Sequence, residues 1–300
     1  MTKKMTFRMK IKKSIPAYLF LFPLFAGILV FSYYPAISGI FHSFFNWNGI
    51  GEKTFIGMEN YKNLFNDAIF INSIPAMLKL MIPKLIISVV VPFVMAELIF
   101  AVRSRKMQAR YRILCLLPMV APGVVGTLLW KYIYDPSTGL AVEILRLFGV
   151  VGQTQNIDWL GNPNLTIGSI IFMGFPWIGG TAVLIYMSGL LNISSEVMEA
   201  SRLDGCSTLK RIFKVDIPLI MGQIRYFVII GIISALQDYS VQIILTDGGP
   251  GYTTYVPGYY MFKQAFAYGN MGYACAIGTL MFIAIFILTL VSMKFLKSEE

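Results

Sequence analysis

The sequence is poor in charged residues, and this scarcity excludes a protein dissolved in water. Charged side chains account for 13% of the 300 residues and hydrophobic ones for 56%, whereas soluble domains carry about 25% charged residues. Too few charges are present to cover a water-exposed surface, so the main solvent of this chain must be lipid.

Residues that build catalytic and metal sites are scarce as well. The chain contains one histidine, His42, and three cysteines, Cys115, Cys206 and Cys275, which share no CxxC spacing. This pattern argues against a zinc site, a disulfide framework and a Ser-His protease. The phosphate-binding pattern GxxxxGK[ST] is also missing, so the chain has no nucleotide cradle of its own. We therefore expect no enzymatic activity, and no metal or cofactor bound by this chain.

What the sequence does contain is a series of long apolar runs. A bilayer core about 30 Å thick needs about 20 such residues per helix, and backbone groups in hydrocarbon must pair within their own segment. None of the runs shows the alternation of a membrane β-barrel strand. The sequence therefore predicts an all-α integral membrane protein with six transmembrane helices, at roughly residues 17–45, 71–102, 113–134, 165–191, 219–245 and 272–295.

The second run is the least regular, because Lys79, Pro83, Lys84 and Pro92 interrupt it. We expect residues 71–84 to be partly interfacial or to face a cavity. The two lysines could contact an anionic solute, but extension of their side chains to the outer surface explains them more simply.

Basic residues alternate between the connecting segments. They are abundant before the first apolar run, after the second and fourth, and at the C-terminus, and they are sparse in between. The positive-inside rule then makes both termini cytoplasmic, with tails at residues 1–16 and 297–300 around a membrane domain at 17–296. The net charge of +10 thus reflects topology and does not indicate nucleic acid. Glu97, near the inner end of the second helix, is expected to pair with the basic cluster that begins at Arg103.

The cytoplasmic connector at residues 192–218 has a helical pattern of its own. Asn192, Ser194 and Ser195 can end the fourth helix and cap a new, short one. Asp204-Gly205 can stop that helix, since glycine adopts a positive φ at little cost. A second, amphipathic piece follows, and Pro218 suits the start of the next membrane helix. The residues alone leave a plain connector and a docking element equally open.

This connector resembles the EAA loop of the permease subunits of ATP-binding-cassette importers. The family pattern runs E-A-A, then D-G-A, then an apolar-Pro pair, and Ser201 and Cys206 stand where small alanines are usual. The resemblance implies that the short helix fits a cleft on a separate ATPase and carries its motion into the membrane. The matching residues are Glu199, Ala200, Ser201, Asp204, Gly205, Ile217 and Pro218.

Further motifs in order along the chain resemble the sugar-type permeases of this class. They include "AYLFLFPLFAGILVFSYYPAISGIFHSFFNWNG", "FIGMENYKNLF", "LLPMVAPGVVGTLLWKYIYDPSTGL" and "WLGNP". The segment "LTDGGPGYTTYVPGYYMFKQAF" resembles the outer turn before the last helix, with Gly248, Gly249, Pro250 and Gly251 at its tip.

The resemblance implies a type I ABC importer permease fold and a set of partners. This subunit would translocate a sugar, oligosaccharide or related polyol across a bacterial or archaeal plasma (inner) membrane. Its expected partners are a second permease, usually a different chain, two ATPase subunits that carry ATP-Mg, and an extracytoplasmic solute-binding protein.

Polar and aromatic groups inside the membrane runs are candidates for the solute pathway, because such groups are costly in lipid. Asp238 and Gln242 share a helix face at i, i+4 spacing, and aromatic rings can stack on sugars. Hydrogen bonds to the partner permease and simple gap filling are the alternatives, and Gly179 and Gly180 are expected to permit close packing or a bend. The candidates are Gln237, Asp238, Tyr239, Gln242, Trp177 and Tyr186.

The main alternative function is secondary transport driven by an ion gradient, with Asp238 as the coupling carboxylate. Such transporters commonly contain internal repeats with paired broken helices. The two halves of this sequence show no convincing repeat, and a membrane-embedded enzyme is disfavoured by the missing nucleophile, base and metal ligands.

Overall fold

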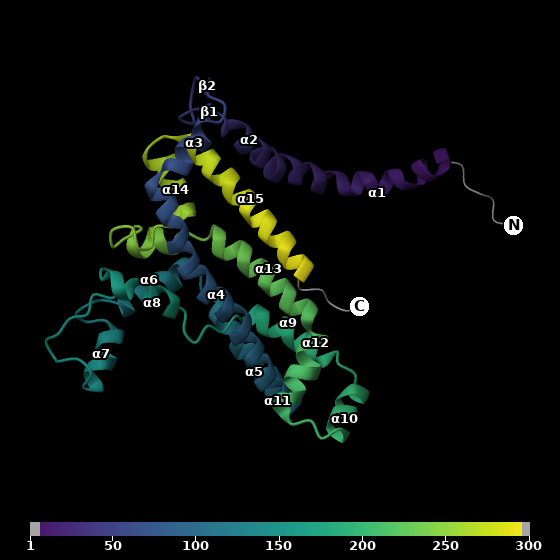
Figure 1. Cartoon of the computed structure of the whole chain (residues 1–300). Coiled ribbons are helices and arrows are strands. Elements are labelled where there is room, and N and C mark those ends of the chain that lie inside the picture. Colours follow the sequence, from purple (N-terminus) through teal and green to yellow (C-terminus); the bar gives the residue numbers. More distant parts are fainter. Residues whose placement is uncertain (1–6, 296–300) are drawn as a thin grey trace.

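A computed structural model describes residues 7–295 of the chain, which fold almost entirely into helices (Figure 1). The predicted C-terminal tail at 297–300 and the first six residues of the predicted N-terminal tail lie outside the described residues. In chain order the N-terminal half contains α1 (Phe7–Ile28), η1 (Leu29–Tyr33), α2 (Tyr34–His42), β1 (Phe45–Asn46), β2 (Thr54–Phe55), α3 (Glu59–Asn66), α4 (Ala68–Phe100), α5 (Arg105–Leu116), η2 (Leu117–Val120), α6 (Gly123–Ile133) and α7 (Leu140–Leu147). The C-terminal half contains α8 (Pro163–Phe172), α9 (Gly180–Leu191), α10 (Ser195–Leu203), α11 (Thr208–Arg211), η3 (Ile212–Asp216), α12 (Ile217–Leu219), α13 (Met221–Gln237), η4 (Gln242–Thr246), α14 (Pro257–Phe262), η5 (Lys263–Ala267) and α15 (Met271–Phe295).

Four helical stretches of the described residues are long and apolar enough to cross a membrane. They are Ser14–His42, Ala68–Phe100, Met221–Thr246 and Met271–Lys294. Two further pairs meet the same criteria only as bent units: α5 with η2 and α6, bent by 84°, and α9 with α10, bent by 75°. By length and composition, the described part of the chain therefore holds four to six spans.

The third and fourth predicted spans are broken where the sequence would have them continuous. In the third, residues 113–134, the bend lies beside Pro118 and Pro122, which cannot donate a backbone hydrogen bond to the preceding turn. In the fourth, residues 165–191, α8 ends at Phe172 and α9 begins at Gly180. The intervening segment contains glycines and a proline, which favour a break.

The second span, in contrast, is a single helix of 33 residues in spite of Pro75, Pro83 and Pro92. At 1.5 Å per residue α4 is about 50 Å long, and it packs against α8, α9, α13 and α14. It thus runs through the centre of the molecule, as Figure 1 shows. Two apolar clusters lie along it, one around Tyr259 and Ile277 and the other around Val183 and Leu190.

Close helix packing next to α4 depends on a glycine. A Cβ atom at Gly180, the first residue of α9, would lie 2.4 Å from the carbonyl oxygen of Cys115 on α5. Any side chain there would collide with backbone. This confirms the expectation that Gly180 permits close packing.

The first span stands apart from the rest. No residue of its apolar window is buried, and Figure 1 shows α1 extending away from the other helices after α2 has contacted α15. Helix α1 begins at Phe7, so it extends into the segment predicted as a tail.

Asp67 connects three elements at the end of the molecule that holds β1, β2 and α3. Its Oδ1 accepts the N–H groups of Ile69 and Phe70 and so caps α4. Its Oδ2 accepts hydrogen bonds from Tyr260 on α14 and Tyr273 on α15, the latter at 2.8 Å. Burial of Asp67 opposes ionisation, but these four hydrogen bonds outweigh it and lower the pKa of the carboxyl group.

Because the pKa of Asp67 is lower in the folded protein than in the unfolded chain, its stabilising contribution is present above about pH 4 and is lost as the pH falls. Asp67→Asn keeps a capping residue but removes the charge, so we expect a loss of about 1 to 3 kcal/mol at pH 7. Thermal unfolding in detergent at pH 7 and at pH 3.5 measures this loss. A difference between wild type and variant that does not shrink at low pH would contradict the assignment.

Candidate functional sites: the loop after α9 and the cavity beside α4

The loop that follows α9 forms the predicted short helix, bend and second helical piece. The Ser194 hydroxyl caps α10 by accepting the N–H of Val197 at 3.4 Å. Gly205 ends the turn with a φ of +68°, and the N–H of Cys206 reaches back to the carbonyl of Ser201 at 3.0 Å. The Ser207 hydroxyl then caps α11 through the N–H of Lys210.

Most of the EAA-like residues lie on the exposed side of this loop. Glu199, Ala200, Asp204 and Gly205 are exposed, whereas Ser201 is buried and its hydroxyl donates to the carbonyl of Met198. Several apolar side chains of the loop are also exposed; they include Leu203 at 89%, Leu209 at 69% and Phe213 at 68%. At the other end of the predicted motif, Ile217 and Pro218 form the start of α12.

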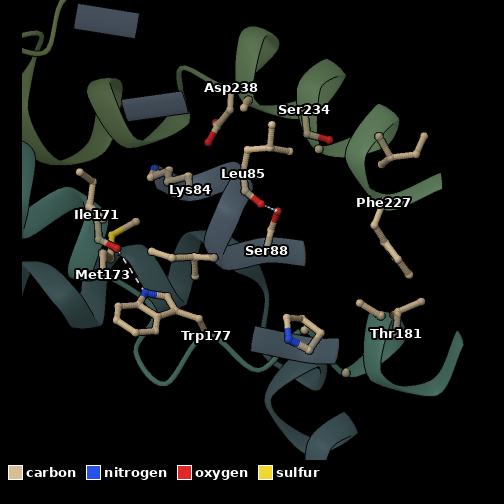
Figure 2. A pocket seen from close by; sticks show the side chains of 18 of the residues that line it. Lys84, Leu85, Ser88, Ile171, Met173, Trp177, Thr181, Phe227, Ser234 and Asp238 are labelled. Atoms are coloured by element: carbon tan, nitrogen blue, oxygen red, sulfur yellow. Dashed lines mark hydrogen bonds between the residues drawn. The ribbon is translucent and has the colours of Figure 1, made fainter. Parts of the chain in front are cut away.

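A cavity of about 610 Å³ lies between α4, α13 and the segment that joins α8 to α9 (Figure 2). Its walls are mostly apolar, and a few polar side chains converge on it: Lys84, Ser88, Trp177, Thr181, Ser234 and Asp238. Solute-binding sites typically have volumes of about 300 to 1,000 Å³ and this composition. The cavity is therefore the best-formed candidate for a solute pathway in the described residues.

Lys84 and Asp238 face each other at one end of this cavity, as Figure 2 shows. One carboxylate oxygen of Asp238 accepts hydrogen bonds from the backbone N–H and the hydroxyl of Ser240. The expectation that Lys84 extends to the outer surface is wrong, because its side chain lines the cavity, where it faces Asp238. The opposite charges compensate each other, which reduces the cost of placing either in the membrane.

Gln242 lies next to this pair. It lines a small adjoining cavity of about 30 Å³ together with Lys84 and Asp238, and its buried Oε1 has no hydrogen-bond partner within the described residues. Asp238 and Gln242 do not share a helix face as predicted, since α13 ends at Gln237 and the backbone at Asp238 is extended. They converge because the chain breaks between them.

Trp177 also lines the cavity, with a φ of +56° that is rare for a residue other than glycine. Its indole N–H donates to the carbonyl of Ile171 at 3.2 Å (Figure 2). Phe172 and Phe175 pack edge-on against its ring, at centroid distances of 5.6 and 5.0 Å. The ring is therefore held in position at the wall.

Three of the predicted pathway residues line neither this cavity nor the small one beside it. Tyr186 is completely buried, because its ring packs between Phe93 and Phe227. Tyr239 lines a separate apolar pocket of about 420 Å³ between α2, α14 and α15. Gln237 is exposed at the end of α13.

Ser88 and Ser234 line the cavity but were not among the predicted residues. Lys84, Ser88 and Pro92 recur at i, i+4 and i+8 on α4, and Ser234 lies four residues before Asp238, the residue that directly follows α13. This spacing places each set on one helix face. The periodicity of the sequence could therefore have identified Ser88 and Ser234 as residues of the same face as Lys84 and Asp238. Pro92 has no N–H to offer the carbonyl of Ser88, which leaves an acceptor near the cavity.

The outer turn forms a tight, internally bonded structure. Asp247 and Gly248 both have positive φ values, +49° and +83°, and a Cβ at Gly248 would lie 2.3 Å from the ring of Tyr255. The Thr254 hydroxyl donates to the carbonyl of Gly249. Hydrogen bonds from Tyr259 and Lys263 lower the pKa of Asp247. Pro250 and Gly251 complete the turn.

The chain thus combines apolar helices, several of them broken, with a mostly apolar cavity that a few polar side chains face and an exposed helical loop; these features are typical of a membrane transport component. The chain matches the family described as "Binding-protein-dependent transport system inner membrane component" over residues 6–298. It is 32% identical over 289 residues to the probable ABC transporter permease protein YurN of Bacillus subtilis, covering 96% of this chain and 98% of that protein. It belongs to this family and is a multi-pass membrane permease component, not an enzyme.

Two further similarities agree with this assignment. The multiple sugar-binding transport system permease protein MsmF of Streptococcus mutans is 29% identical over 277 residues, 91% of this chain and 92% of that protein. A bacterial ABC transporter that imports the acidic polysaccharide alginate contains a chain of the same fold, with a TM-score of 0.83 at 21% identity and 96% coverage of both chains. The six-helix, type I permease architecture expected from the sequence is consistent with this match.

If the cavity contains water, cysteines on its wall will react with a charged thiol reagent. In a variant whose three native cysteines are replaced by serine, we expect Ser88→Cys to be modified by a membrane-impermeant methanethiosulfonate. Val90 is 47% exposed and lies two residues after Ser88, on the opposite face of the same helix. Val90→Cys should stay unmodified, because thiolates form in water and not in lipid. Equal labelling of both positions, measured by mass spectrometry, would contradict the assignment.

Proposed function

We propose that this chain is a permease subunit of an ABC importer that takes up a carbohydrate, meaning a sugar, an oligosaccharide or a related polyol. The observation that carries the proposal is the presence in one chain of a cavity on which polar side chains converge and an exposed helical loop of the EAA type. The named relatives support the substrate class: MsmF belongs to a multiple sugar-binding system, and AraP of Bacillus subtilis to an arabinooligosaccharide system.

The lining of the cavity suits a polyhydroxylated solute. Ser88, Thr181 and Ser234 supply hydroxyl groups that both donate and accept hydrogen bonds. Trp177 supplies an aromatic face on which the apolar side of a sugar ring can stack. The Lys84–Asp238 pair adds a strong donor and a strong acceptor without adding net charge.

We propose that ATP hydrolysis on two separate ATPase subunits, which carry ATP-Mg, drives transport through the loop at residues 199–218. The exposed Glu199, Ala200, Asp204 and Gly205 then form the docking surface. Nucleotide binding can switch the permease only if it favours one conformation over another. The loop lies on the outside of the helical bundle and has exposed apolar side chains at Leu203 and Leu209, so it is suited to dock on another subunit and to follow its movement.

A second permease chain, usually a different sequence in this class, is the proposed partner within the membrane. Helix α1 supports this partnership because it leaves its own bundle, and no residue of the apolar window within Ser14–His42 is buried. A solute-binding protein on the extracytoplasmic face completes the complex, in a bacterial or archaeal plasma (inner) membrane.

Gly205 provides the sharpest test of the loop. Gly205 and Gly149 have nearly identical φ values, +68° and +67°, and a Cβ at either position would meet no other atom within 4 Å. Gly205→Val and Gly149→Val therefore introduce the same backbone strain, one in the docking loop and one in the turn after α7. Coupling between two sites typically changes the affinity at one of them about 5- to 150-fold. We therefore expect Gly205→Val to lower ATP-driven uptake about tenfold and Gly149→Val to leave uptake unchanged.

Uptake is measured in cells with a panel of labelled maltotriose, raffinose and arabinotriose, and the ATPase that copurifies with the tagged chain is quantified. Full activity of Gly205→Val with normal assembly would refute the coupling role. Uptake that survives ATP depletion but collapses with the proton or sodium gradient would instead favour secondary transport through Asp238.

The partner permease is detected through α1. A photoreactive amino acid at Phe20, which is 85% exposed, should form an adduct with a second permease chain, because an apolar helix gains stability by packing against another helix. The same probe at Val150, 68% exposed in the segment after α7, serves as the control. Mass spectrometry identifies the adduct, and lipid adducts alone at Phe20 would contradict the proposal.

A further inference from the structure

An ion cluster joins the cytoplasmic loop to α4. Arg211, the last residue of α11, donates through Nε to Asp216 Oδ2 at 2.8 Å and through a terminal nitrogen to Glu97 Oε2 at 3.3 Å. The guanidinium carbon also lies 5.6 Å from the centroid of the Phe100 ring on α4. Glu97 and Phe100 are three residues apart and share a face of α4. The pairing of Glu97 with the Arg103 cluster, expected from the sequence, is wrong.

All three charges are largely removed from solvent. The side chains of Asp216, Glu97 and Arg211 are 0%, 7% and 15% exposed. The second oxygen of each carboxylate is buried without a hydrogen-bond partner within the described residues. Two buried carboxylates thus depend on one guanidinium, and removal of that partner would leave uncompensated buried charge, which is strongly unfavourable.

Other polar connections between the loop and the membrane helices are sparse. Among residues 14–294, whose side chains the structure describes, the Arg211–Glu97 contact is the one side-chain hydrogen bond that links residues 195–216 to a membrane-spanning helix. In α10 only Ser201 is buried, and it bonds within its own helix. The loop is therefore attached to α4 at one strong point, and a displacement of the loop can act on α4 through it.

Helix α4 continues from this attachment to the cavity without a break. Glu97 lies five residues after Pro92 and thirteen after Lys84, both of which line the cavity, a span of about 20 Å along the helix. Phe93, between them, packs edge-on against Tyr186 at 5.7 Å. A push on the inner end of α4 acts on the same rigid element that carries Lys84, Ser88 and Pro92.

We propose that the Glu97–Arg211–Asp216 cluster is the mechanical link through which movement of the docked loop reaches the cavity-lining face of α4. Arg211 and Glu97 are positioning residues: they touch neither solute nor nucleotide, and they transmit displacement because neither carboxylate can be left unpaired. This inference rests on the proposed function, since it assumes that a separate ATPase moves the loop.

The test compares three changes, each of which removes one charge, in the complete complex purified from native membranes and reconstituted in vesicles. Glu97→Gln and Arg211→Gln break the link. Arg103→Gln removes an exposed positive charge just beyond the end of α4 and serves as the matched control. ATP hydrolysis and ATP-driven uptake of maltotriose, raffinose and arabinotriose are measured in parallel.

We expect Glu97→Gln and Arg211→Gln to hydrolyse ATP at a rate within about twofold of wild type while uptake falls about tenfold, within the usual range of coupling strengths. Arg103→Gln should resemble wild type. The double variant Glu97→Gln, Arg211→Gln should be no worse than either single one, because both remove the same link.

A covalent replacement separates a mechanical role from a merely structural one. With the native cysteines replaced by serine, Glu97→Cys and Arg211→Cys are joined by a short bis-methanethiosulfonate reagent. Uptake should recover when the bridge forms and fall again when a reductant cleaves it. Failure of a formed bridge to restore uptake would overturn the proposal.

The remaining outcomes also decide the matter. Normal uptake in both Gln variants overturns this inference alone, as does a proportional loss of hydrolysis, uptake and assembly, which would indicate only a structural role. A wild-type complex that shows no ATP-driven uptake would overturn the proposed function and this inference with it.

Discussion

The inability of hydrocarbon to hydrogen-bond the backbone is the constraint on which the rest of this structure depends. It forces each apolar run into helix, and it confines every break to places where protein or a cavity can receive the freed polar groups. The gap between α8 and α9 lies at the cavity, and so does the end of α13 at Asp238. The breaks that interrupt the spans are therefore also the means by which polar groups reach the interior.

Helix α4 is the complement of these broken elements. It contains three prolines yet stays continuous. It meets Asp67 at its N-terminal end, the cavity in its middle and Arg211 near its C-terminal end. Neighbouring helices that bend or stop can change conformation locally, whereas a continuous helix moves as one body. The architecture thus combines one continuous central helix with neighbours that are broken.

The fold class and the approximate spans followed from the sequence because they depend on composition and run length, which are local properties. The loop helices also followed, because Ser194 and Gly205 are local capping signals. The residues that lie opposite Glu97 and Lys84 did not. Glu97 was assigned to Arg103, a sequence neighbour, but binds Arg211, which is 114 positions away, and Lys84 faces Asp238, which also lies far along the chain. Periodicity shows which face a residue occupies, and it cannot show which distant segment lies opposite.

The isolated position of α1 has a consequence for any contact that this helix makes in the bilayer. No residue of its apolar window is buried by the rest of the chain, so in the membrane lipid tails cover it, and these are as apolar as its own side chains. A protein helix that replaced the lipid would gain little from the hydrophobic effect and would have to bind through close packing. The fit of the two surfaces, and not their apolar area, would then decide which protein can bind there.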